Sequence, residues 1–252
     1  MLRALFRQPF DDVRACIDGV ARAPRPYVAL AATPLAMLLA WFVYTPIHEL
    51  LHVLGCVATG GTVSELEIQP IYGGALLAEV FPFVVSGGEY AGRLSGFDTG
   101  GSDLVYLATD FAPYLLTILI GVPALRLAAR RSRPMLFGVG VVLGLAPFYN
   151  LPGDYYEMGS ILTTRIASWL VSGTGSLAYE GLRSDDVFAL IGRLFASPAE
   201  LGLGAGETTV ALGLISLSLA IAILLACLTY SVGRAVSAAL IGSGSTSEPS
   251  KK

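Results

Sequence analysis

The sequence predicts an all-α polytopic membrane protein with about four transmembrane helices and a small β-rich insert after the first of them. Three observations predict this fold class. Of the 252 residues, 54% are hydrophobic and only 14% are charged, whereas soluble domains carry about a quarter charged residues. The mean hydropathy is +0.67. Several apolar stretches also approach or exceed the roughly 20 residues that a helix needs to cross a bilayer.

Four apolar stretches are the predicted transmembrane helices, at 28–58, 104–125, 134–150 and 209–232. The first is longer than the hydrocarbon core, so it must tilt, kink near Pro34 or Pro46, or project beyond the lipid. The third is short, and we expect the residues after it to extend it. Its glycines, Gly138, Gly140 and Gly144, would let helices approach closely, and packing within this chain is the preferred interpretation.

The distribution of arginines predicts the orientation. The leading segment holds five arginines and the 126–133 link holds four, whereas the 59–103 segment holds only Arg93. Because positive charge accumulates in cytoplasmic loops, we expect both termini and this link to lie in the cytoplasm. We expect the chain to be a multi-pass protein of the cell membrane. The net charge of −3 implies no bulk attraction to nucleic acid.

The remaining segments complete the domain organisation. In the 59–103 segment, VSELEIQPI partly alternates and GGALLAEVFPFVV is apolar and β-prone, which predicts the β-rich insert. Further on, SDDVFALIGRLF predicts a short helix that is capped by Ser184. The predicted organisation is an amphipathic juxtamembrane segment at 1–27, a transmembrane core with the insert at 28–160, an extramembrane connector at 161–207, the fourth transmembrane helix at 208–241 and a flexible tail at 242–252.

His48, Glu49 and His52 form an HExxH pattern near the end of the first span. Residues four apart lie one turn apart on the same face of a helix, so the two imidazoles can bind one zinc ion. Glu49 would then be the general base for water that the zinc activates. The alternative is a pair of buried histidines bonded to carbonyls, but it leaves a glutamate in an apolar helix, where ionisable groups are usually functional. We therefore predict one zinc ion per chain.

A catalytic zinc ion has three protein ligands and one open position. The chain has no further histidine, so the third ligand should be a carboxylate or a thiolate. Asp154, after a Pro-Gly break at the end of the third span, is the preferred candidate, and Glu157 is the alternative. Cys56 lies one turn beyond His52 but is better interpreted as a packing thiol. Asp110 lies inside the second span. It either supports a metal ligand or contacts the substrate, or it reaches toward water at the membrane interface.

These motifs resemble the site-2 protease family of intramembrane zinc metalloproteases. That family pairs HExxH in one transmembrane helix with an N-x-x-P-x-x-x-L-D-G-like motif in a later one. Asn150, Pro152 and Asp154 match the second motif in kind and order, although the spacing is shorter and Tyr155 stands where the family has glycine. Phe111-Ala112-Pro113 resembles the family's A-G-P segment, and residues 62–90 correspond to its β-rich insert. The resemblance covers roughly residues 28–160.

The resemblance implies a zinc metalloprotease that cleaves membrane-embedded or membrane-proximal proteins. It implies that Asp154 is the third ligand and that Asn150 contacts substrate. The insert could accept the substrate as an added strand or act as a plug or lid. Family members usually hold the metal towards the cytoplasm, whereas the arginines here place it near the outer face. Two alternatives stay open: a zinc-dependent membrane hydrolase for a lipid-linked amide, and a non-catalytic metal-binding membrane protein.

Overall fold

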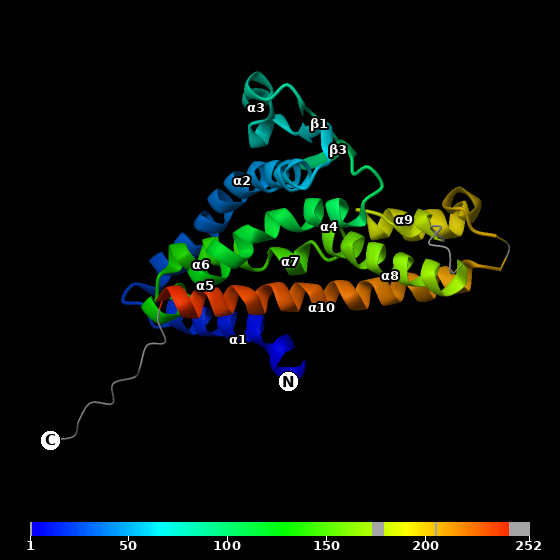
Figure 1. Cartoon of the computed structure of the whole chain (residues 1–252). Coiled ribbons are helices and arrows are strands. Elements are labelled where there is room, and N and C mark those ends of the chain that lie inside the picture. Colours follow the sequence, from blue (N-terminus) through cyan, green and yellow to red (C-terminus); the bar gives the residue numbers. More distant parts are fainter. Residues whose placement is uncertain (1, 173–178, 205, 242–252) are drawn as a thin grey trace. The chain divides into compact units, whose positions relative to one another are not determined.

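A computed structural model of the chain describes residues 2–172, 179–204 and 206–241 (Figure 1). The predicted tail at 242–252 lies outside the described residues. The helices are α1 (Leu2–Ala21), α2 (Pro26–Ala58), α3 (Gly74–Val80), α4 (Asp103–Phe111), α5 (Val122–Arg131), α6 (Pro134–Gly144), α7 (Ala146–Tyr149), α8 (Asp154–Ser172), α9 (Val187–Ala196) and α10 (Thr208–Ile241). The strands are β1 (Thr62–Ile68), β2 (Val84–Ser86) and β3 (Gly92–Asp98).

Three helical segments of the described chain are long and apolar enough to cross a membrane. They are α2, the segment Asp103–Arg131 that contains α4 and α5, and α10. The predicted third span at 134–150 is divided into α6 and α7, and neither is long enough alone. The prediction of a mostly helical membrane protein is therefore confirmed for three candidate spans, while the fourth crossing stays a prediction.

The chain divides into two compact units. The first unit takes residues 1–40, 116–145 and 229–252, and the second takes 41–115 and 146–228. Helices α2 and α10 each supply residues to both units. The residues predicted to carry the chemistry all fall in the second unit.

Glycines bring the helices of the first unit into backbone contact. A Cβ added to Gly138 would lie 2.5 Å from the Thr33 carbonyl oxygen, and one added to Gly140 would lie 2.7 Å from the Leu125 nitrogen. The distance from Gly144 to Gly121 is also short, at 3.1 Å from an added Cβ to the carbonyl carbon. The predicted packing of these glycines within the chain is thus confirmed.

Helix α1 packs in the first unit through a few polar contacts. The Asp12 carboxylate accepts a hydrogen bond from the Tyr230 hydroxyl at 3.0 Å and lies 3.3 Å from Arg234 Nε. The buried Cys16 thiol donates to the Leu125 carbonyl at 3.1 Å. On the same helix Phe6, Phe10 and Ile17 stay exposed. A position of this helix at a membrane surface, which its amphipathic pattern predicts, stays a prediction.

The insert of the second unit is a three-stranded sheet in the order β2-β1-β3. Strand β1 is parallel to β2 and antiparallel to β3, so β1 is paired on both edges and β3 is an edge strand. The buried side chains of Leu66, Ile68 and Val84 pack on Val53 of α2. This contact anchors the sheet to the end of α2, where Figure 1 shows it in cyan.

Two local predictions were wrong. Residues 74–80, expected to be β-prone, form helix α3, because GALLAEV holds strong helix formers and Gly73 begins it from a left-handed backbone with φ 85°. Helix α9 is capped by Asp186 rather than Ser184. The Asp186 carboxylate accepts from the Phe188 and Ala189 N–H groups at 2.9 Å, while the Ser184 hydroxyl accepts from the Asp186 N–H.

Helix α8 starts at the predicted third ligand and runs on to Ser172, so the predicted connector at 161–207 begins inside a helix. Its small residues face α10: a Cβ added to Gly159 would lie 2.3 Å from the Ser218 carbonyl oxygen. Tyr156, Leu190 and Ile215 represent the buried cluster that α8, α9 and α10 share. This packing holds the start of α8 in place.

Candidate metal centre

Helix α2 presents the two histidines as the HExxH spacing requires. His48 and His52 lie one turn apart and both are buried. Their Nε2 atoms are 3.1 Å apart, with the rings at 85° to each other. The helical period therefore places both nitrogen donors on one face of α2.

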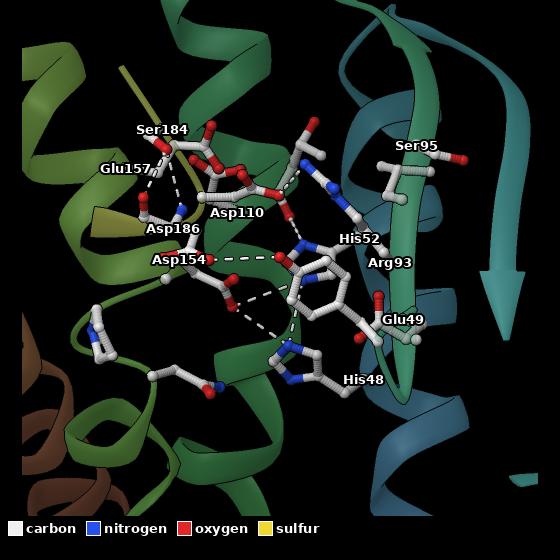
Figure 2. Close-up of a pocket in the computed structure, with 18 of the residues that line it drawn as sticks. His48, Glu49, His52, Arg93, Ser95, Asp110, Asp154, Glu157, Ser184 and Asp186 are labelled. Atoms are coloured by element: carbon white, nitrogen blue, oxygen red, sulfur yellow. Dashed lines mark hydrogen bonds and ion pairs between the residues drawn. The ribbon is translucent and has the colours of Figure 1, made fainter. Parts of the chain in front are cut away.

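Asp154 supplies the third donor from the first residue of α8. Its Oδ2 lies 3.2 Å from His48 Nε2 and 3.6 Å from His52 Nε2. Helix α8 begins there because the chain turns through Pro152 and Gly153, whose N–H donates to the Asn150 carbonyl. Figure 2 shows the two rings and the carboxylate turned toward one another.

The three donors fit a zinc ion. Ligand atoms that share a tetrahedral zinc ion at 2.0–2.1 Å lie roughly 3.3 Å apart, which matches the separations of His48, His52 and Asp154. One ligand atom from each residue lies within 4.8 Å of the others, and this is the one such group in the described part of the chain. Two imidazoles and a carboxylate are also a common donor set of catalytic zinc sites.

Hydrogen bonds from neighbouring groups hold each donor in this orientation. The Thr109 carbonyl accepts a hydrogen bond from His52 Nδ1 at 2.8 Å, so the lone pair of His52 is on Nε2 and faces the centre. The Tyr44 hydroxyl is bonded to His48 Nδ1 at 2.7 Å. The Tyr114 hydroxyl donates to Asp154 Oδ2 at 2.5 Å. Such outer partners fix ring orientation and tautomer in metal sites.

Glu49 lies beside the group and not in it. Its side chain lines the same cavity as the three donors. Strand β3 approaches it closely, since a Cβ added to Gly92 would lie 2.4 Å from Glu49 Cγ and 3.2 Å from Oε1. The lack of a side chain at Gly92 leaves room for the Glu49 carboxylate between the strand and the helix. The carboxylate is thus held near the donors and open to the cavity.

A cavity of about 750 Å³ surrounds these residues. Its lining comes from α2, β3, α4, α8 and the segment 183–186 that leads into α9. At its edge, Arg93 of β3 forms an ion pair with Asp185 at 2.8 Å, and the Tyr90 hydroxyl donates to Asp186 at 3.3 Å. Arg183 pairs with Asp103 at 2.9 Å.

The other predicted site residues are placed as follows. Glu157 lines the cavity but accepts a hydrogen bond from the Tyr106 hydroxyl at 2.5 Å, and it is not one of the three donors. Asp110 lines the cavity and is 4% exposed. Asn150 also lines it. Cys56 lies outside the group, with its thiol 3.7 Å from the Thr62 carbonyl oxygen.

Several residues around the site were not anticipated from the sequence. Tyr44 precedes His48 by one helical turn, so the periodicity that found His52 could have found it. Tyr114, Tyr106 and Gly92 carry no such signal, because their positions depend on how α4 and β3 meet α2 and α8. The acidic segment at 185–186 was assigned to a connector and gave no indication that it borders the cavity.

Comparisons of the chain with models of known families, with curated proteins and with solved structures find no match. The class of the protein is therefore inferred from the chain's own fold and site. It is a helical membrane protein whose His48, His52 and Asp154 could hold a metal ion.

Proposed function

We propose that this chain is an intramembrane zinc metalloprotease that hydrolyses peptide bonds of membrane-embedded or membrane-proximal proteins. The observation that carries the proposal is the convergence of His48, His52 and Asp154 in a cavity that Glu49 also lines. Structural zinc sites are closed by four protein ligands, whereas catalytic sites keep one position open. Three donors beside a free carboxylate match the catalytic pattern.

The roles of the residues follow from their positions. A bound zinc ion would supply Lewis-acid activation of water and of the substrate carbonyl. Glu49 accepts the proton from the attacking water and passes it to the nitrogen of the leaving amine as the C–N bond breaks. Tyr44 and the Thr109 carbonyl keep the Nε2 atoms of the two histidines aimed at the centre, and Tyr114 orients Asp154.

Strand β3 is the surface on which an extended substrate would bind. A substrate helix must unwind before its amides are accessible, and pairing with an edge strand replaces the lost main-chain hydrogen bonds. Strand β3 has a free edge and lines the cavity. These two features favour β3 as the strand that pairs with the substrate, over the strands at 62–90 that were considered from the sequence. Peptide substrates with single N-methylated amides around the cleaved bond test this. If the substrate pairs with β3, methylation of alternate amides should abolish cleavage. Equal cleavage of all the methylated peptides would exclude strand pairing.

The membrane arrangement adds two further parts to the proposal. Helix α6 together with α7 forms a fourth crossing, and both termini lie in the cytoplasm, as the arginines predict. Epitope tags at each terminus of the full chain, exposed to protease in intact and in permeabilised cells, test the orientation. Removal of the tags by protease in intact cells would show that the termini lie outside the cell.

The central experiment measures zinc and cleavage in the same preparations. Purified wild type should hold one zinc ion per chain and cleave a membrane-anchored reporter. Glu49→Gln should keep the zinc and lose at least about 100-fold in rate, since general base catalysis contributes roughly 10²–10⁴-fold. The matched control is Glu79→Gln on α3, an exposed glutamate outside the cavity, which should behave as wild type.

The outcomes separate this proposal from its alternatives. Zinc with Glu49-dependent turnover of a lipid-linked amide, and no protein cleavage, would favour the non-protein hydrolase. Zinc with no Glu49-dependent reaction would favour a metal-binding role. Asn150, which lines the cavity, is proposed to contact the substrate, and Asn150→Ala should therefore raise KM while leaving the zinc content unchanged.

A further inference from the structure

The cavity contains two buried carboxylates that neither the metal group nor the proton transfer uses. Asp110 lies on α4 and Glu157 on α8, and both line the cavity. They are 4% and 8% exposed. In Figure 2 they lie above Asp154, while His48 lies below it. Glu157 follows Asp154 by nearly one helical turn, so this acidic pair adjoins the metal group.

The Asp110 carboxylate has one unsatisfied oxygen. Its Oδ2 is fully buried and has no hydrogen-bond partner among the described residues. Among the described residues, the Glu157 carboxylate accepts a hydrogen bond only from the neutral hydroxyl of Tyr106, a residue one turn before Asp110 on α4. A buried carboxylate that is neither paired nor bonded is strongly unfavourable. Both side chains line the cavity, so a cationic group that enters it would offset this cost.

No cation of the described chain neutralises the pair. Arg93 is joined to Asp185 and Arg183 to Asp103, and no ion pair of the described residues includes Asp110 or Glu157. Arg193 also borders the cavity but forms no ion pair with them. The two carboxyl groups thus line the cavity without a cationic partner from the described chain, beside the point where three donors converge.

We infer that Asp110 and Glu157 form a subsite for the cationic side chain, lysine or arginine, of a substrate residue close to the bond that is cleaved. An ammonium or guanidinium group supplies several donors and a full positive charge, which match two carboxylates with open acceptor positions. A second metal ion fits less well, because the pair belongs to no group of three metal-binding side chains in the described chain. The inference rests on the proposed function and gives it a substrate preference.

The first experiment compares cleavage of reporters that differ in one residue. Lysine is placed in turn at each position of a neutral transmembrane reporter, and each variant is paired with a glutamine version. We expect one or two positions next to the cleaved bond where lysine, compared with glutamine, raises kcat/KM about 30-fold. Removal of one partner of a buried charge pair has an effect of this size. Asp110→Asn and Glu157→Gln should each remove most of this preference while cleavage of the glutamine reporters continues.

The second experiment does not depend on cleavage. The zinc-loaded Glu49→Gln chain in detergent is titrated with a fluorescent hexapeptide in two versions, which carry either one lysine or one glutamine and no other charged side chain. The lysine peptide should bind about 30-fold more tightly, and adding Asp110→Asn should abolish the difference. Because Asn has the shape of Asp, and Asp110 Oδ2 has no partner to lose, the thermal unfolding midpoint and zinc content should not fall.

The two experiments distinguish the subsite from the protease proposal. Cleavage with no preference for a cation, or a preference that survives Asp110→Asn and Glu157→Gln, overturns the subsite and leaves the protease intact. Charge-dependent peptide binding without any cleavage supports the subsite and counts against the protease. A second zinc ion per chain that disappears in Asp110→Asn would show a metal pair and overturn the organic cation.

Discussion

Each unit of this protein holds a carboxylate that is at least partly buried, and the two units treat it differently. In the first unit Asp12 is bonded to Tyr230 and lies beside Arg234. Even so, burial raises its pKa above the ordinary value by more than the nearby guanidinium lowers it. In the second unit Asp110 Oδ2 has no partner among the described residues, and Asp154 faces two imidazoles. A carboxylate satisfied within the fold indicates structure, whereas one left open toward a cavity indicates a ligand.

The strongest test of this difference is the loss of a predicted metal ligand. Asp154→Ala should reduce zinc affinity by well over the 10–100-fold that removal of an outer partner causes, and should abolish cleavage. Zinc content after dialysis, measured by mass spectrometry, checks it. The matched variant Asp12→Asn in the other unit should keep the full zinc content. Equal zinc in Asp154→Ala and wild type would remove the metal centre.

Substitution of Gly92 should impair catalysis without loss of the metal. The new methyl group of Gly92→Ala overlaps the Glu49 side chain and displaces the carboxylate, so we expect a loss of about 10–100-fold in kcat. The control is Gly192→Ala on α9, where an added Cβ meets nothing within 4 Å. Unchanged kcat in Gly92→Ala would mean that Glu49 is not the base or is not held by β3.

Removal of an outer hydrogen bond should weaken zinc binding moderately. Tyr44→Phe deletes the hydroxyl that is bonded to His48 Nδ1, and we expect about 10–100-fold lower zinc affinity. Competition with a zinc chelator measures it. Tyr27→Phe is the control, since Tyr27 is 86% exposed. If the two variants bind zinc equally well, the Tyr44 contact contributes nothing to the centre.

The first unit should respond to substitution through stability alone. Gly138→Ala places a methyl group against the Thr33 carbonyl, and such overpacking destabilises a protein by about 1–3 kcal/mol. The unfolding midpoint in detergent should fall while zinc stoichiometry is retained. A variant as stable as wild type would show that the α2–α6 contact is looser than its glycines indicate.

Asp12→Asn should have the smallest effect on stability. Because burial already opposes the Asp12 charge, replacement of the ion pair by a neutral amide should change the free energy of unfolding by about 1 kcal/mol or less. Chemical denaturation in mixed micelles checks it. A loss of several kcal/mol would show that this carboxylate matters more to its unit than burial and contact suggest.

The sequence predicted what depends on local spacing. The HExxH helix, the apolar spans α2 and α10 and the small sheet all follow from periodicity and composition, and Asp154 followed from its place after a Pro-Gly break. Residues 74–80 were mistaken for strand because apolar content was weighted above the helix preference of Ala, Leu and Glu. The partners Tyr106, Tyr114 and Gly92 could not be predicted, since no local pattern specifies which distant helix or strand a side chain meets.

The order in which the donors occur along the chain has a consequence for biosynthesis. His48 and His52 leave the ribosome early, whereas Asp154 follows only after the sheet and α4 to α7 have been made. A nascent polypeptide therefore contains its histidine helix before the candidate metal group is complete. A product truncated before α8 would hold only two of the three donor residues of this group.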